Sequence, residues 1–155
     1  MADMLVKLYE LPDATEQFAE LENLGVTIRR ALAPEKHVVV NWVEENFSKA
    51  WASECDVSFA RQPAGCFIAV ESKQIVGFAC YEATCKNFFG PTGVLENQRG
   101  RGVGKALLFA ALKAMRDEGY AYAIIGGVGP AEFYEKAVGA KLIENSAPGI
   151  YRGLL

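Results

Sequence analysis

The chain has 155 residues, of which 51% are hydrophobic and 23% are charged, values that fit one folded domain and exclude a disordered chain. The net charge of −3 and the lack of an apolar run of transmembrane length give no sign of a nucleic-acid or membrane partner. The N-terminal stretch does not resemble a signal peptide, so we expect a cytoplasmic protein with reduced thiols.

The first third of the chain predicts a strand, a helix, a second strand and a second helix. A short apolar run over 4–11 indicates the first strand, and Asp13 with Glu16 forms a plausible capping box for a helix that ends near residue 24. A strand is predicted over 26–32. Pro34 then opens a helix whose apolar positions recur at helical spacing as far as Phe47. Residues 51–65 show no clear period and are predicted to be irregular.

The rest of the chain first predicts consecutive strands and then alternating helices and strands. Residues 66–70 and 74–83 are predicted strands, and the near-continuous apolarity of the second indicates cover on both faces. Pro91 predicts a broken or bulged strand over 88–94. Then come a helix to about residue 118, a strand over 120–125, a helix over 130–138, a strand over 140–143 and a short last strand at 150–151.

This order predicts a mixed α/β fold. Consecutive strands indicate antiparallel hairpins, whereas the later alternation indicates parallel crossovers. We therefore expect a single domain over residues 1–155. Its sheet is mostly antiparallel and then parallel, with helices on both faces.

A glycine-rich turn precedes the longest predicted helix. Residues 99–105 read Arg-Gly-Arg-Gly-Val-Gly-Lys. Free N–H groups at such a helix start, beside the positive end of the helix dipole, favour an anion such as phosphate. A Walker A loop is excluded because Ala106 follows Lys105 and Arg99 occupies the first glycine position. A dinucleotide-binding fingerprint is excluded because its last glycine is replaced by Lys105.

The turn fits the pattern [QR]-x-x-G-x-[GA] at Arg99, Gly102 and Gly104. With a strand that ends at Val94 before it and a leucine-rich helix after it, the turn resembles motif A of the GNAT acetyltransferases. The resemblance covers roughly residues 26–145, so residues 1–25 form an N-terminal extension of a strand plus a helix. It implies an acyl-CoA N-acyltransferase-like fold with acetyl-CoA as co-substrate.

The resemblance also implies which residues bind acetyl-CoA. The loop amides would hold its pyrophosphate, and the end of the preceding strand would pair with its pantetheine arm. Nearby cations would aid capture of the polyphosphate. The implied cofactor-binding residues are Thr92, Gly93, Val94, Arg99, Gly100, Arg101, Gly102, Val103, Gly104 and Lys105.

Two departures from the family pattern concern contacts with CoA. Glu96 stands where the family usually has proline, and Gly127 stands where it often has asparagine. The second loses a side-chain contact with CoA, for which the backbone of Gly127 or Gly129 is a substitute.

Tyr134 is the implied catalytic acid. It lies in a segment that resembles the family's Y-E-K-x-G-F, with one extra residue before the glycine. A phenol suits protonation of a departing thiolate. For the general base no motif exists, and Glu82 is the first choice, with Glu96 and Glu132 as rivals. We expect His37 to lie at the surface.

The four cysteines show no C-x-x-C spacing and the chain has one histidine, so no metal site is expected. A nucleophilic Cys80 or Cys85 would give an acetyl-enzyme. Cys80 lies in a strongly apolar strand, however, and direct attack of an amine on the thioester is favoured.

The sequence therefore predicts an N-acetyltransferase that moves the acetyl group of acetyl-CoA to a primary amine on a small molecule or peptide. An acyl-CoA-binding sensor domain without turnover, and a transferase for another acyl group, remain as alternatives. Homodimers are common in this architecture, so a homodimer is left open.

Overall fold

The computed structural model describes residues 1–155 as one seven-stranded sheet with five helices. The strands and helices are β1 Met4–Lys7, α1 Thr15–Asn23, β2 Val26–Arg30, α2 Lys36–Asn46, α3 Lys49–Ser58, β3 Cys66–Glu71, β4 Gln74–Tyr81, β5 Phe88–Val94, α4 Val103–Asp117, β6 Tyr122–Ile125, α5 Ala131–Val138 and β7 Lys141–Leu142. None of the helices combines the length and the apolarity that crossing a bilayer requires.

The sheet has the strand order β2-β3-β4-β5-β6-β1-β7. Neighbouring strands are antiparallel except β5 and β6, which are parallel. The predicted mixed α/β sheet with helices on both faces is thus confirmed. A parallel pair needs a long crossover, and here α4 supplies it.

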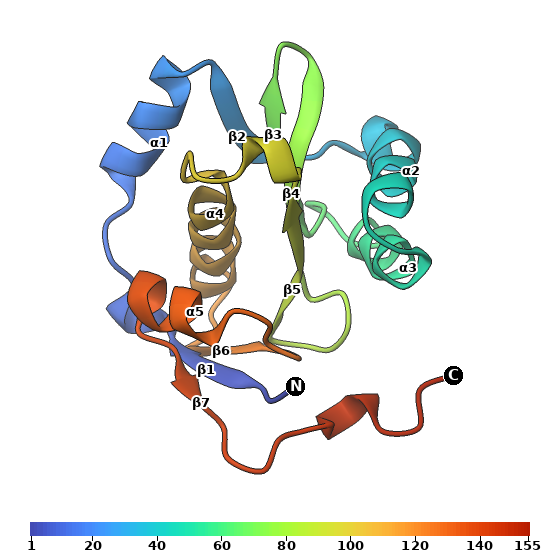
Figure 1. Ribbon diagram of the computed structural model, residues 1–155, viewed down its shortest axis with the longest axis vertical. Coiled ribbons are helices and arrows are strands. Elements are labelled where there is room, and N and C mark those ends of the chain that lie inside the picture. Colours follow the sequence, from blue (N-terminus) through green and yellow to red (C-terminus); the bar gives the residue numbers. More distant parts are fainter.

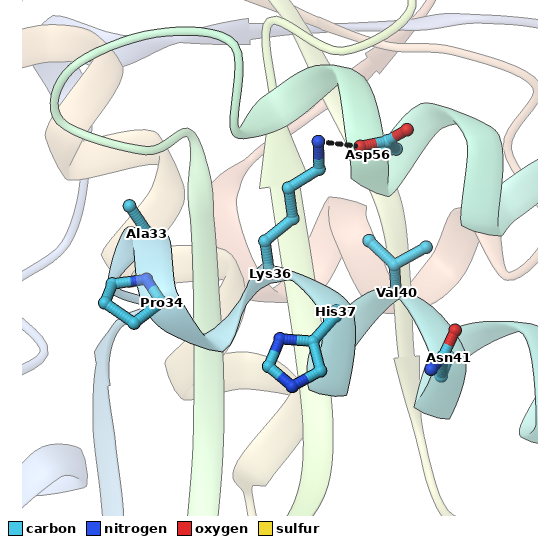
Figure 2. Close-up of a pocket in the computed structure, with 7 residues that line it drawn as sticks. All are labelled: Ala33, Pro34, Lys36, His37, Val40, Asn41 and Asp56. Atoms are coloured by element: carbon cyan, nitrogen blue, oxygen red, sulfur yellow. Dashed lines mark ion pairs between the residues drawn. The ribbon is translucent and has the colours of Figure 1, made fainter.

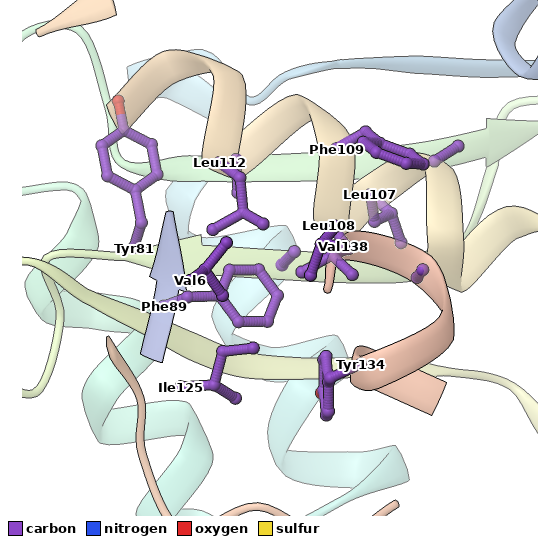
Figure 3. Close-up of a cluster of buried hydrophobic side chains, with 14 of the residues drawn as sticks. Val6, Tyr81, Phe89, Leu107, Leu108, Phe109, Leu112, Ile125, Tyr134 and Val138 are labelled. Atoms are coloured by element: carbon purple, nitrogen blue, oxygen red, sulfur yellow. The ribbon is translucent and has the colours of Figure 1, made fainter. Parts of the chain in front are cut away.

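Helices cover the two faces of the sheet unequally. Figure 1 shows α1, α4 and α5 on one face and α2 and α3 on the other. The larger core surrounds α4 and includes Leu107, Leu108 and Leu112, drawn in Figure 3. The smaller core, with Val43 and Phe78, lies under α2 and α3. Because both faces are covered, β4 is buried on both sides, in agreement with its continuous apolar run.

The N-terminal strand is an internal part of the sheet. Met4 pairs with Ile125 of β6 on one side and with Leu142 of β7 on the other. Met4 and Val6 have no exposed surface. The first strand therefore joins β6 to β7, and α1 follows it onto the face that carries α4.

Three local expectations are wrong. Residues 49–58 form α3, not an irregular segment. Ser48 begins this helix by accepting the Trp51 N–H at 3.1 Å, and its buried positions are small residues that give little apolar signal: Ala52, Cys55 and Ser58. The expected strand at 150–151 is a 3-10 helix over Gly149–Tyr151. The first strand stops at Lys7.

The start of α1 also differs in detail. Asp13 Oδ1 accepts hydrogen bonds from the backbone N–H and the hydroxyl of Thr15, at 2.9 and 2.6 Å. No reciprocal bond from Glu16 completes a capping box.

The expected bulge in β5 is confirmed. Ala79 pairs with Thr92 and Tyr81 pairs with Phe89, so Gly90 and Pro91 lie opposite the single residue Cys80. The bulge bends β5 at the point where its pairing with β6 ends.

Candidate functional site

The two parallel strands separate after a short contact. β5 pairs with β6 only at Phe88 with Ile124 and at Phe89 with Ile125. Beyond this point β5 stays bonded to β4 alone. The parallel pair therefore leaves one edge of β5 open along its second half.

The hydrogen-bond alternation decides which backbone groups face that open edge. Leu95 N–H donates to Val76 O at 3.0 Å, so in the antiparallel pattern Gly93 points its N–H and C=O toward β4. Those of Thr92 and Val94 point away from β4, toward the open edge. Of the three strand residues expected to pair with pantetheine, two thus have backbone groups directed there.

The glycine-rich turn of residues 99–105, called the glycine loop from here on, follows this strand after a short 3-10 turn. Gly100 and Gly102 both adopt a positive φ, +84° and +85°, which only glycine takes without strain, and α4 begins at Val103. None of the six backbone N–H groups from Gly100 to Lys105 donates a hydrogen bond within the chain. These donors lie at the positive end of a 15-residue helix, an arrangement that suits a pyrophosphate.

The three cations of the loop are not equivalent. Arg101 forms an ion pair with Glu71 at 2.7 Å and donates to Gln98 at 2.6 Å, so it ties the loop to β3. Arg99 is exposed and its Nε donates to Val94 O at 3.3 Å. Lys105 has its Nζ 5.9 Å from the centre of the Phe109 ring. Arg99 and Lys105 are therefore free of acidic partners.

Gln17 of α1 contacts the loop, and the sequence did not indicate this contact. Its Nε2 donates to Gly102 O at 3.3 Å. A Cβ added at Gly102 would lie 2.6 Å from the same nitrogen. No motif includes α1, because its contact with the loop spans 85 residues of sequence.

A cavity of about 1030 Å³ lies at the open edge of β5. It is bounded by α3, the turn after β4, the bulge of β5, the β6–α5 loop and the C-terminal segment. Its walls are mostly apolar. The lining consists of Met1, Ala50, Trp51, Ser53, Glu54, Val57, Ala83, Thr84, Cys85, Phe89, Gly90, Pro91, Thr92, Ile125, Gly126, Gly127, Val128, Gly129, Pro130, Tyr134, Pro148, Ile150, Tyr151 and Leu154.

Tyr134 of α5 lies at the boundary between the larger core and this cavity. Only 6% of it is exposed, and its ring packs edge-on against Phe89 and Phe133, with centroid distances of 6.4 and 5.0 Å. Figure 3 shows it in one buried cluster with Phe89 and Ile125. Burial raises the pKa of the Tyr134 phenol to about 12, so it stays protonated at neutral pH.

This raised pKa predicts an alkaline loss of stability. The unfolded phenol ionises near pH 10, so the unfolded state releases its proton first and stability falls as the pH rises toward 12. Relative to Tyr134→Phe, the wild type should lose about 1 kcal/mol by about pH 11. Urea unfolding of both proteins at about pH 8, 10 and 11 measures this difference, and equal losses in both would contradict it.

None of the predicted bases lines the cavity. Glu82 Oε1 accepts the Asn87 N–H at 2.7 Å, and a hydrogen bond with Glu82 raises the pKa of Tyr120. Glu132 is exposed and paired with Lys136 at 2.7 Å. Glu96 is exposed in a 3-10 turn. The assignment of Glu82 as general base stays a prediction.

A second hollow, of about 510 Å³, lies on the outer side of α2 and α3 (Figure 2). It contains His37 and an ion pair between Lys36 and Asp56 at 2.7 Å, both about half exposed. Its charges are already paired and it includes no residue of the glycine loop. It therefore offers no acetyl-CoA site.

The cysteines separate into two groups. Cys85 lines the cavity. The other three are buried in the smaller core with their sulfur atoms within 4.8 Å of one another, close enough to hold a metal ion: Cys55, Cys66 and Cys80. Burial raises the pKa of Cys80 well above its ordinary value and favours the neutral thiol. The expectation of no metal stays a prediction.

Gly93 is fixed by packing. A Cβ there would lie 2.6 Å from Cε1 and Cζ of Phe47, whose ring is held by Trp42, Trp51 and Phe78 at centroid distances of 5.4 to 5.6 Å. We expect Gly93→Ala to lower the free energy of unfolding by about 1–3 kcal/mol because the ring cannot retreat. Chemical denaturation measures the loss.

The matched control is Gly104→Ala, whose Cβ would meet only Val94 Cγ2 at an ordinary 3.6 Å. This variant should keep or slightly raise stability. A Gly93→Ala variant as stable as Gly104→Ala would show that Phe47 does repack.

Glu54 and Thr84 are cavity residues that sequence reasoning missed. Thr84 Oγ1 donates to Glu54 Oε1 across the space between the turn after β4 and α3. Glu54 lies in the stretch expected to be irregular, where no helical face could be assigned to it. Only a predicted helix over 49–58 would have indicated the face on which Glu54 lies.

The sequence profile of the acetyltransferase (GNAT) family matches residues 36–140. No curated protein sequence matches the chain. The matched range includes the glycine loop, the bulged strand and Tyr134.

Solved structures share the fold. A GCN5-related glucosamine N-acetyltransferase region of a fungal multi-domain β-N-acetylglucosaminidase superposes with a TM-score of 0.73 at 15% identity, over 92% of this chain and 19% of that one. A GCN5-related N-acetyltransferase from Sphaerobacter thermophilus gives 0.70 at 24% identity, over 92% and 48%. A GNAT acetyltransferase from Brucella melitensis in complex with acetyl-CoA gives 0.54 at 18% identity, over 76% and 86%. This chain spans about half or less of the first two.

Proposed function

This chain belongs to the GNAT acetyltransferase family, and we propose that it transfers the acetyl group of acetyl-CoA to a primary amine by direct attack in a ternary complex. The observation that carries the proposal is the run of six unpaired N–H groups from Gly100 to Lys105, set beside the open edge of β5. The Brucella melitensis neighbour, a structure with acetyl-CoA, supports the same co-substrate.

Backbone groups form most of the half of the site that would bind acetyl-CoA, the acetyl donor. The loop amides and the exposed Arg99 would hold the pyrophosphate, since oriented N–H groups at a helix start favour an anion. Thr92 and Val94 would offer backbone N–H and C=O groups to the amide groups of pantetheine. Gly127 N–H already donates to Asp3 Oδ1 at 2.8 Å, so it is not free to replace the missing asparagine contact.

The chemistry itself needs an amine, a thioester and a proton donor. Acetyl-CoA supplies the thioester carbon that the neutral amine attacks, and the carbon–sulfur bond then breaks as the new amide forms. Tyr134 would donate its proton to the departing sulfur. The desolvation that raises the pKa of the phenol acts on a thiolate in the same cavity, which keeps the two pKa values comparable.

The substrate ammonium must lose a proton to a base before the neutral amine attacks, and Glu82 remains the proposed base. The carboxylate of Glu82 accepts the Asn87 N–H and lies outside the cavity. A proton could therefore reach it only through water molecules. A Glu82→Gln variant decides this. A base would flatten the acid limb of the pH–rate profile, whereas a loop cap would change only stability.

Release of free thiol from acetyl-CoA in the presence of a panel of amines tests the proposed function. Amine-dependent release, with the acetylated product identified by mass spectrometry, supports acetyl transfer. Binding of CoA without turnover on any amine would indicate instead a sensor domain.

A further inference from the structure

We propose that the acceptor is an amphipathic primary monoamine and that Glu54 binds its ammonium group. Such an amine carries one ammonium on an aromatic or alkyl group. This inference rests on the proposed function, because it concerns the second substrate of the same site. It is carried by the charges and walls of the cavity, which the glycine loop does not determine.

Glu54 is the only charged side chain that lines the cavity. Thr84 donates to its Oε1 and so orients the carboxylate, whereas Oε2 receives no hydrogen bond within the chain. No lysine or arginine of the lining neutralises it. Tyr151 lines the same cavity, and its pKa is raised first by burial and then by the negative charge of Glu54. A carboxylate with a free oxygen in an apolar cavity is the counter-charge that an ammonium needs.

More than half of the residues that line the cavity are hydrophobic. On α3 and the C-terminal segment the apolar lining residues include Trp51, Val57, Pro148, Ile150 and Leu154, and Ser53 and Tyr151 add hydroxyl groups. These side chains suit a hydrocarbon body, because burial of apolar surface stabilises binding by about 25 cal/mol per Å². The acceptor therefore combines one charge with an apolar remainder.

The same lining disfavours other amines. A polyamine or an aminoglycoside brings several ammonium groups, and only one carboxylate is there to meet them. A free amino acid brings a carboxylate of its own, for which the lining has no cationic side chain and offers only the terminal amine of Met1. Burying an unpaired charge is costly, so each additional charge should weaken binding.

Glu54 and Tyr134 also line the cavity from different elements. Glu54 comes from α3, whereas Tyr134 comes from α5, and the open edge of β5 with Thr92 belongs to the same lining. An amine held by Glu54 would thus share one cavity with the proposed acetyl donor and the proposed acid.

Matched pairs of amines test whether an additional charge on the acceptor weakens its use as a substrate. 2-Phenylethylamine and phenylalanine differ by one carboxylate, and hexylamine and 1,6-diaminohexane differ by one ammonium. We expect kcat/KM, measured by thiol release from acetyl-CoA, to be about 10- to 100-fold higher for the first member of each pair, since one unpaired buried charge is involved. Equal or reversed values would overturn the assignment of the acceptor and leave acetyl transfer in place.

Variants at Glu54 test its role. Glu54→Gln should raise KM for hexylamine at least about tenfold without changing KM for acetyl-CoA, as expected for the loss of a hydrogen bond to a charged group. Glu54→Asp, which keeps the charge, should restore part of the affinity. Glu44→Gln, an exposed change on α2 without an ion-pair partner, is the control and should match the wild type. An unchanged KM for hexylamine in folded Glu54→Gln would overturn the proposal. If the wild type turned over no amine, both the proposed function and this assignment of the acceptor would be overturned.

Discussion

Gly102→Glu should abolish the binding of CoA. Gly102 lies in the middle of the six unpaired N–H groups, with φ at +85°. The new side chain would place a carboxylate among donors that are proposed to hold a pyrophosphate, and like charges at close range cost several kcal/mol. We expect the affinity for CoA to fall at least about a hundredfold, measured by isothermal titration calorimetry.

Backbone strain alone could also weaken the loop, and Gly119→Glu separates the two causes. Gly119 follows the other end of the same helix with φ at +105°, and a Cβ there meets no atom within 4 Å. This control adds the same charge and a comparable strain far from the loop. It should bind CoA like the wild type. Equal affinities of the two variants would remove the loop from the binding site.

Tyr134→Phe should lower kcat about a hundredfold or more while KM for acetyl-CoA changes little, because it removes one proton donor and keeps the ring. The ring packs against Phe89 and Phe133, so the variant should fold. Steady-state kinetics at saturating amine, together with calorimetry of CoA binding, separate a catalytic loss from a loss of binding.

Tyr151 is the rival acid, since it lines the same cavity and its phenol also has a raised pKa, caused first by burial. Tyr151→Phe is therefore the matched control and should keep most of the turnover. If it lowered kcat and Tyr134→Phe did not, the proton donor would be Tyr151.

The glycine loop could be predicted because its information is local. Strand, glycines and helix lie within about 30 residues, and each position has one physical reason: positive φ at Gly100 and Gly102, and an open helix start. The bulge in β5 was equally local, since Pro91 cannot donate to a ladder.

The acceptor half could not be predicted because it is assembled from distant segments. Thr84 and Glu54 are 30 residues apart, and the cavity also takes residues from the C-terminal segment. The pairing of Arg101 with Glu71 likewise spans 30 residues, so sequence alone could not distinguish a structural cation from one free for phosphate. The place of β1 between β6 and β7 depends on contacts across almost the whole chain.

The central claim is that the N–H groups from Gly100 to Lys105 receive the pyrophosphate of CoA. Amide NMR spectra of ¹⁵N-labelled protein, titrated with CoA and separately with pantetheine, test it most directly, because pantetheine lacks the pyrophosphate. We predict that the amide resonances of these six residues shift with CoA and stay in place with pantetheine. Resonances that remain unmoved while CoA binds and shifts other parts of the spectrum would contradict the account.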